Sequence, residues 1–321
     1  MPIASHRPSR GHVLGAFAIV YLVWGSTYLA IRYAIASLPP LLMAAARFLV
    51  AGVALYAWVR LRGRAARPTR AEWRWAGLAG VLMLAGGNGA VVWAEQRAPS
   101  GIVALIVATV ALWVVVIEWV RPGGRRPGAL VAGGVVLGLV GIGVLVGPGR
   151  LGTGGVDPLA AGVLVLAALS WAGGSLLARS PRMPKPTLLG AAMQMVAGGT
   201  ALLVAGIVSG ELARLDLRGV TGVSLAALAY LVVFGSLIGY STFVWLVSNV
   251  APARAATYAY VNPVVAVVLG WAIAGERIDA RVLVASAIIV AAVALVTAGQ
   301  VPRRDAAPGA RSTRGREDAA A

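Results

Sequence analysis

Polar and charged side chains interrupt an otherwise apolar segment near the start of the chain. Residues 13–23 are largely apolar, and "WGSTYLAIR" follows directly, ending at Arg32. Trp24 and Tyr28 are four residues apart, so they share one face of a helix. Small and hydroxyl residues such as Ser26 can serve helix packing alone. An aromatic pair in mid-segment is less usual, because membrane aromatics gather at the interfaces. These residues therefore favour the wall of a binding cavity.

Similar side chains recur at comparable depth in other apolar segments. Amide, hydroxyl and aromatic groups can orient a small molecule through hydrogen bonds and ring contacts. Pro263 removes a backbone donor and releases the carbonyl about four residues earlier, so it is the expected hinge. The expected substrate-pathway residues are Trp24, Ser26, Tyr28, Asn88, Trp93, Thr109, Trp113, Trp171, Ser175, Tyr240, Trp245, Tyr258 and Asn262.

Three charged residues lie within or at the end of apolar segments. Arg32 and Arg47 fall inside such segments, where a charge costs on the order of 3 kcal/mol or more and faces a partner. The candidate partners are Glu95, at the end of the third segment, and helix C-terminal carbonyls. The pattern leaves two roles open for the arginines: joining helices, or attracting a substrate carboxylate during release.

The other acids and the missing residue types exclude several kinds of chemistry. Every Asp and Glu falls in an expected loop, tail or helix end, with Glu95 and Glu118 nearest to membrane depth. A titrating carboxylate at the membrane centre is therefore not expected, while passive transport or coupling through a peripheral Glu stays open. The chain has no cysteine and no phosphate-binding loop, so we expect no metal, no cofactor and no ATP drive within this chain. The apolar segments contain neither Ser with His nor paired aspartates, so we expect no enzyme activity.

Composition indicates that these residues lie on membrane-spanning helices. The chain is 59% hydrophobic and 12% charged, against about 25% charged in typical soluble domains. Its apolar runs have the length of membrane helices and lack the alternation of barrel strands. The expected fold is an all-α membrane protein with ten helices at about 13–36, 40–61, 73–94, 98–120, 128–147, 158–179, 187–209, 221–248, 252–274 and 280–299.

The net charge of +17 is a signal of topology. One set of alternate loops and termini carries 20 Lys and Arg residues, and the other set carries six, balanced by acids. Positive residues beside membrane spans stay on the cytoplasmic side, so both termini are expected there, and nucleic acid is not an expected partner. The Arg-rich segment 301–321 is expected to be a disordered cytoplasmic tail.

The two halves of the chain contain matching segments. The segment "PSGIVALIVATVALWVVV" (99–116) matches "PARAATYAYVNPVVAVVL" (252–269), and "VVWAEQRAP" (91–99) matches "FVWLVSNVAP" (243–252), at offsets of 152 to 153 and 152 residues. Trp24 has its counterpart in Trp171, 147 residues later. The common order indicates a duplicated unit of five helices. Because five is odd, the second unit enters the membrane inverted, as in transporters that bind substrate between repeats.

These motifs resemble the EamA family of the drug/metabolite transporter superfamily. The similarity covers residues 12 to 299, and "WGSTYLAIRYAI", "GNGAVVWAEQ" and "TYAYVNPVVAVVLGWAIAGE" are most like bacterial inner-membrane members. The resemblance implies export of small metabolites, amino acids among them, through a cavity built from the first, third and fourth helices of each repeat. Ala111 departs from the family, in which proline is frequent at this position.

The expected organisation is one repeat at 12–148, a second at 157–299, and the tail. The expected function is a multi-pass transporter of the bacterial inner membrane that alternates access around a midplane cavity. A non-transporting receptor or scaffold is the alternative. The expected partners are a small-molecule substrate (an amino acid, metabolite or drug) and the lipid bilayer. We expect a monomer, with a homodimer through the small-residue pairs at 134, 138, 143 and 147 as the alternative.

Overall fold

The computed structural model describes residues 9–63, 66–124, 126–146, 157–250, 255 and 257–299, and every regular element in these ranges is helical. The side chain of Tyr260 lies outside the description. The elements are α1 (Arg10–Ala34), α2 (Pro40–Leu61), α3 (Arg70–Gly80), η1 (Val81–Gly89), α4 (Ala90–Ala94), α5 (Ser100–Val107), α6 (Val110–Val120), α7 (Ala129–Val146), α8 (Pro158–Leu177), α9 (Thr187–Val208), η2 (Leu212–Arg214), α10 (Gly222–Tyr230), η3 (Leu231–Tyr240), α11 (Ser241–Asn249), α13 (Tyr258–Ala274) and α14 (Ala280–Gly299).

Several of these elements join into longer spans. Arg70–Ala94, Ser100–Val120 and Gly222–Asn249 each run across consecutive elements, and the described residues hold nine helices long and apolar enough to cross a membrane. The apolar part of α13, Val261–Ala274, is shorter. The expected span 252–274 begins among residues outside the described ranges, so a tenth span stays a prediction. For the described residues, the expected helical fold with membrane-length apolar spans is confirmed.

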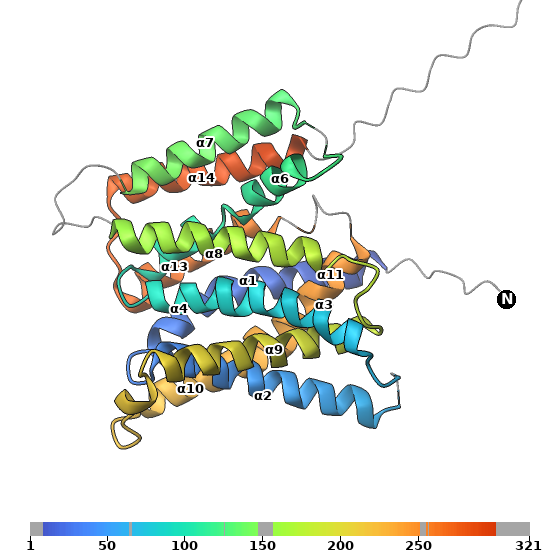
Figure 1. Cartoon of the computed structure of the whole chain (residues 1–321). Helices are drawn as coiled ribbons and strands as arrows, with labels where there is room; N and C mark the ends of the chain where they lie inside the picture. The colour runs from blue at the N-terminus through green and yellow to red at the C-terminus, as the bar shows by residue number, and fades with distance from the viewer. Residues whose placement is uncertain are drawn as a thin grey trace, which may run out of the picture.

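The helices run roughly parallel in one bundle with two distinct ends (Figure 1). We call one the arginine-rich end: α1, α3, α7 and α9 begin there, and α2, α6, α8 and α14 end there. The arginine-poor end holds the connections 35–39, 95–99, 209–221 and 275–279. α1 starts at the arginine-rich end and α8 at the arginine-poor end, so the first helices of the two halves run in opposite directions (Figure 1).

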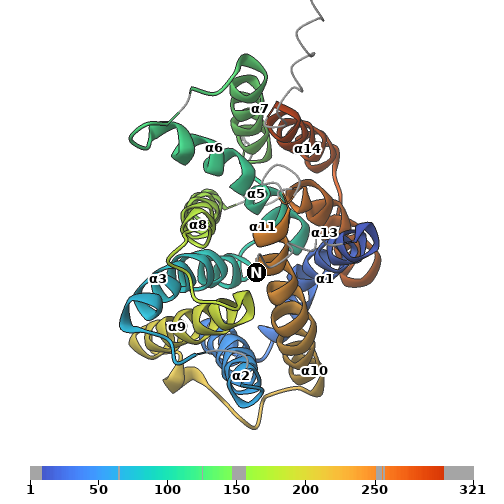
Figure 2. The same ribbon diagram turned by 90° about the vertical axis from the view of Figure 1, so that its right-hand side faces the viewer.

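Helices from the two halves pack in matching pairs. α2 lies along α9 at one edge of the bundle, and α7 lies along α14 at the other (Figure 2). α1 packs against α13, and α8 packs against α5 and α6. In every pair one partner comes from each half, so the core forms only when both halves are present. The apolar contacts of α7 include Val296 of α14 beside Gly134.

The helix starts are set by local residues at some sites and by distant ones at others. Thr69 and Glu72 form a capping box at the start of α3, and Asp157 caps α8. α2 follows Pro39, which supplies no side-chain cap. Oε2 of Glu211 instead accepts hydrogen bonds from the amides of Leu41 and Leu42, at 2.9 and 3.0 Å. An acid of the second half thus satisfies the first turn of α2.

The third span of each half contains a π-helical stretch, η1 in the first and η3 in the second. A π-helix closes hydrogen bonds over five residues, which widens the helix and shifts the faces that follow; such stretches are frequent at functional sites.

The expectation for 301–321, a disordered tail, concerns residues outside the described ranges.

Candidate functional site

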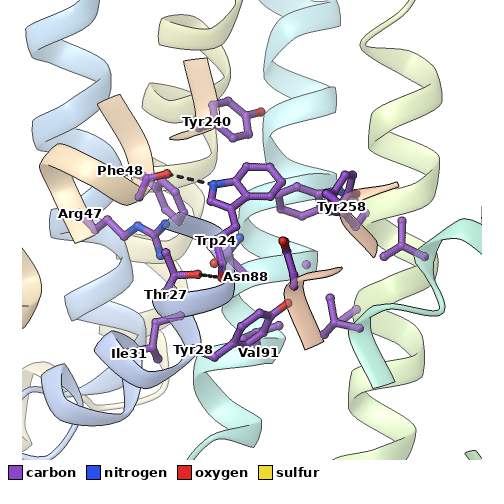
Figure 3. Close-up of a pocket in the computed structure, with 17 residues that line it drawn as sticks. Trp24, Thr27, Tyr28, Ile31, Arg47, Phe48, Asn88, Val91, Tyr240 and Tyr258 are labelled. Atoms are coloured by element: carbon purple, nitrogen blue, oxygen red, sulfur yellow. Dashed lines mark hydrogen bonds between the residues drawn. The ribbon is translucent and has the colours of Figure 1, made fainter. Parts of the chain in front are cut away.

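A cavity lies between the two halves, and Figure 3 shows the side chains that line it. Side chains from α1, α2, α8 and α13 form its wall, together with residues of the third spans and of α5 and α6. Its lining residues are Trp24, Thr27, Tyr28, Ile31, Arg47, Phe48, Gly87, Asn88, Val91, Val107, Val110, Ala167, Trp171, Gly235, Tyr240, Tyr258 and Asn262.

Trp24 is at the centre of an aromatic cluster in this wall. Its Nε1 donates a hydrogen bond to the carbonyl oxygen of Gly235 at 3.2 Å. Its ring meets Trp171 edge-on at 5.7 Å between centroids and Tyr258 edge-on at 5.5 Å. Phe243 packs beside it at 4.8 Å. Edge-to-face pairs of this kind hold rings in fixed orientations, so the cavity has a rigid aromatic side.

The π-helical stretches make room for the two tryptophans. A Cβ at Gly87 in η1 would lie 2.9 Å from Cε3 of Trp171, and a Cβ at Gly239 in η3 would lie 2.8 Å from Nε1 of Trp24. The two glycines are 152 residues apart, the offset of the duplicated segments. Each half therefore accommodates the tryptophan of the other half against a glycine of its own third span.

One polar atom of the wall lacks a hydrogen-bond partner. Within the described ranges, Oδ1 of Asn262 is buried and unpaired. The hydroxyl of Thr27 donates to the carbonyl of Trp24 at 2.7 Å, so it is satisfied by its own helix. The unpaired acceptor of Asn262 is available to a bound molecule.

Eight residues singled out in the sequence lie on this wall. They are Trp24, Tyr28, Arg47, Asn88, Trp171, Tyr240, Tyr258 and Asn262. Arg47 and Phe48 extend the lining to the second helix of the first half, beyond the first, third and fourth helices that the family resemblance implies. Sequence reasoning missed Phe48, Ile31 and Val91, because apolar residues in apolar helices carry no distinguishing signal.

Six other expected pathway residues are absent from the cavity lining. Ser26 hydrogen-bonds to the hydroxyl of Tyr230 at 2.6 Å and thereby joins α1 to α10. Thr109 lies at the break between α5 and α6, where its hydroxyl donates to Ile106 at 2.6 Å. Ser175 donates to the carbonyl of Trp171 at 2.8 Å. The remaining three, packed against the core or another side chain, are Trp93, Trp113 and Trp245.

Pro263 lies inside α13, which continues through it from Tyr258 to Ala274. It directly follows Asn262 of the cavity wall. Its expected role as a hinge remains a prediction.

Glu95, one candidate partner of the two arginines, forms no ion pair with either of them in the described structure. Arg32 pairs with Glu276 at 2.9 Å, and Nε of Arg47 donates to the hydroxyl of Ser236 at 2.9 Å. Glu95 is 6% exposed, and neither of its carboxyl oxygens has a hydrogen-bond partner in the described structure. Burial raises the pKa of the Glu95 carboxyl, Glu276 adds to the rise, and both arginines oppose it.

Glu276 closes the arginine-poor end by joining three segments. Its carboxylate pairs with Arg32 of α1. Glu276 itself directly follows Gly275, the residue of left-handed conformation that ends α13. It also accepts hydrogen bonds from the amide and hydroxyl of Ser100, at 2.9 and 2.8 Å, and from the amide of Gly101 at 3.2 Å. Pro99 gives α5 no side-chain cap, so Glu276 supplies the negative charge that the start of α5 favours. The sequence suggested only a loop charge here.

Comparisons with known proteins agree with this architecture. The model of the EamA-like transporter family matches residues 11–147 and 159–298. The chain is 40% identical to the uncharacterized inner membrane transporter YedA of Escherichia coli K12, over 90% of this chain and 91% of that one. It is 24% identical to a WAT1-related chloroplastic protein of Arabidopsis thaliana, over 86% and 67% of the two chains. A solved crystal structure shares the fold with a TM-score of 0.65 and 21% identity, covering 90% of this chain and 99% of the other.

Proposed function

The chain belongs to the EamA-like transporter family, and from this premise we propose that it exports small metabolites, amino acids among them, across a bacterial inner membrane. In this proposal the two halves are inverted repeats, both termini are cytoplasmic, and the cavity opens alternately to the two sides. Pro263 and the lining residues form the path of the substrate.

The cavity between the halves is the observation that carries this proposal. Its wall combines Trp24 and Tyr28 of the first half with Trp171, Tyr258 and Asn262 of the second. A site shared by two halves changes shape when one half tilts against the other, which is how repeat-built transporters expose a bound molecule to each side in turn. A receptor or scaffold has no need of such a shared site.

Two equivalent arginines support alternating access. Arg32 and Arg179 each follow the tryptophan of their half by eight residues. Arg32 lies at the arginine-poor end and pairs with Glu276, which follows the fourth helix of the other half. Arg179 lies just beyond α8 at the opposite end, and its Nε is buried without a partner among the described residues.

Glu118 is the matching acid for Arg179. It lies in the last turn of α6, in the fourth span of the first half. Burial lowers the pKa of the Arg179 guanidinium, and the charge of Glu118 partly offsets that effect. Each acid acts on the arginine at its own end of the bundle: Glu276 on Arg32, and Glu118 on Arg179. In the described structure only Arg32 and Glu276 form an ion pair. In the proposed cycle, this pair opens when Arg179 and Glu118 close.

The absence of cysteine from the sequence allows a direct test. The hydroxyls of Ser37 and Thr221 are 3.5 Å apart and join the end of α1 to the start of α10 at the arginine-poor end. The double variant Ser37→Cys, Thr221→Cys, reconstituted in liposomes loaded with a labelled metabolite extract, should stop exchange when oxidised and regain it on reduction. Each single variant is the control. Exchange that continues through the cross-link would contradict alternating access, and no exchange by the parent protein would favour a receptor or scaffold.

A further inference from the structure

Arg47 brings a buried positive charge to the cavity wall. The residue is 4% exposed. Its Nε is held by Ser236 of η3, and its guanidinium lies over the ring of Phe48, 4.7 Å from the centroid. Figure 3 shows the guanidinium beside Thr27, on the cavity side of α2. Phe48 and Ser236 thus fix its direction and leave other guanidinium donors toward the cavity.

Within the described ranges, no carboxylate forms an ion pair with this guanidinium. Glu95 is the acid whose charge acts on Arg47, but its oxygens make no hydrogen bond in the described structure. A buried charge without a counter-ion costs several kcal/mol. A bound anion would recover part of that cost, which makes Arg47 a selective site for negative charge.

The fold does not require a charge at this position. The segment "AAAR" that ends at Arg47 corresponds to "AAMQ" ending at Gln194, 147 residues later, the offset that relates the two tryptophans. Gln194 is 1% exposed and accepts a hydrogen bond from the hydroxyl of Tyr240 at 2.5 Å. It does not line the cavity. The half whose residue faces the cavity has the cation, and the other half has a neutral amide.

The rest of the wall fits a flat apolar body. Trp24, Trp171 and Tyr258 present ring faces and edges, and Val107 and Val110 add aliphatic surface. A single guanidinium balances one negative charge, so a dianion would carry an uncompensated charge into the membrane interior. Aromatic rings stack favourably with the tryptophan and tyrosine rings of the wall.

We propose that Arg47 binds the carboxylate of an aromatic monocarboxylate whose ring lies against Trp24, Trp171 and Tyr258. This rests on the proposed transport function and names the substrate class of the same cavity. Arg47 is then the residue that distinguishes an acid from its neutral analogue.

Matched acids and amides test the proposal on the purified full chain in lipid nanodiscs. Phenylacetate is compared with phenylacetamide, and indole-3-acetate with indole-3-acetamide, by calorimetric titration. We expect each acid to bind about ten- to a hundredfold more tightly than its amide, the factor that a hydrogen bond to a charged group supplies. Arg47→Gln, which copies the residue at the equivalent place of the other half, should abolish this preference. Arg47→Lys should keep part of it.

Arg74→Gln, which removes an exposed arginine of α3, is the charge-matched control and should keep the full preference. Equal binding of acids and amides by the parent protein, or no binding of either acid, would overturn the proposal. An unchanged preference in Arg47→Gln would do the same.

A second measurement needs no variant. Phenylglyoxal modifies arginines that it can reach, and in the proposed cycle Arg47 becomes reachable when the cavity opens. Mass spectrometry should then detect modification of Arg47 in the parent protein. Phenylacetate should protect Arg47 and phenylacetamide should not; equal modification with both would refute the carboxylate site. Binding of the acids without exchange in liposomes would contradict only the transport function. A rate of metabolite exchange that is unchanged in Arg47→Gln would contradict only the carboxylate site.

Discussion

Trp24 and Trp171, 147 residues apart in the chain, meet edge to face with 5.7 Å between ring centroids. They occupy equivalent positions in the two halves, so the contact lies where the halves meet. Gly87 and Gly239, one on each third span, make the space for these rings. The cavity wall therefore depends on a glycine and a tryptophan from each half.

Gly87→Ala and Gly239→Ala should each lower stability and transport. The added Cβ would lie within 3 Å of a tryptophan ring atom, 2.9 Å at Gly87 and 2.8 Å at Gly239, and overpacking of this kind costs about 1–3 kcal/mol. Thermal unfolding in nanodiscs and liposome exchange measure the two effects. Gly173→Ala adds the same group on α8 where the space is open, so it should behave as the parent protein. Equal behaviour of all three variants would contradict the packing argument.

Glu276→Gln should destabilise the protein by about 2 kcal/mol, the scale of hydrogen bonds to a charged group. It weakens the cap on α5 at Ser100 and Gly101. The ion pair adds less, because the Arg32 side chain is 42% exposed. The unfolding temperature in nanodiscs reports the loss. Glu95→Gln at pH 5 is the control, since it removes an acid with no hydrogen bond in the described structure. A greater loss of stability in Glu95→Gln than in Glu276→Gln would contradict the role of Glu276 as the stabilising acid at this end.

Glu95 should make stability fall as pH rises. It lies one residue beyond the span ending at Ala94, facing Glu276, Arg32 and Arg47, and burial raises the pKa of its carboxyl. The folded state therefore keeps a proton that the unfolded chain releases near pH 4.3, the approximate value for a free Glu. Its contribution is complete below that pH and is lost as pH rises toward the folded pKa.

The measurement is the unfolding temperature of the parent protein and of Glu95→Gln between pH 5 and pH 8. The variant should be the more stable of the two at pH 8 and similar at pH 5. Parallel curves would show that Glu95 does not titrate differently in the folded state.

Both termini should be cytoplasmic. The 20-to-six split of loop Lys and Arg is the reason, and α1 begins at the same end of the bundle at which α14 ends (Figure 1). A reporter active only outside the cytoplasm should give no signal after residue 300 and a strong signal within the connection 209–221. The opposite pattern would invert the proposed direction of the pathway.

Residue type alone identified many of the cavity-lining residues. It did not identify the π-helical stretches or the ion pair at the arginine-poor end. Trp24, Asn88 and Asn262 were recognisable because polar and aromatic groups are exceptional in apolar spans. The π-helical stretches were not, because widening a helical turn leaves no trace in composition. Glu95 was a candidate partner for Arg32 because it lies at the end of the third apolar segment. The true partner, Glu276, is 244 residues away, and only packing of the two halves brings it near.

The capping of α2 and α5 has a consequence for the order of synthesis. Glu211 and Glu276, which satisfy the first amides of these helices, belong to the second half of the chain. While the ribosome is still making that half, the first five spans already exist, with two helix starts lacking their acceptors. The early intermediate is therefore incomplete at one face, and translation of the second half of the chain completes two helices of the first half.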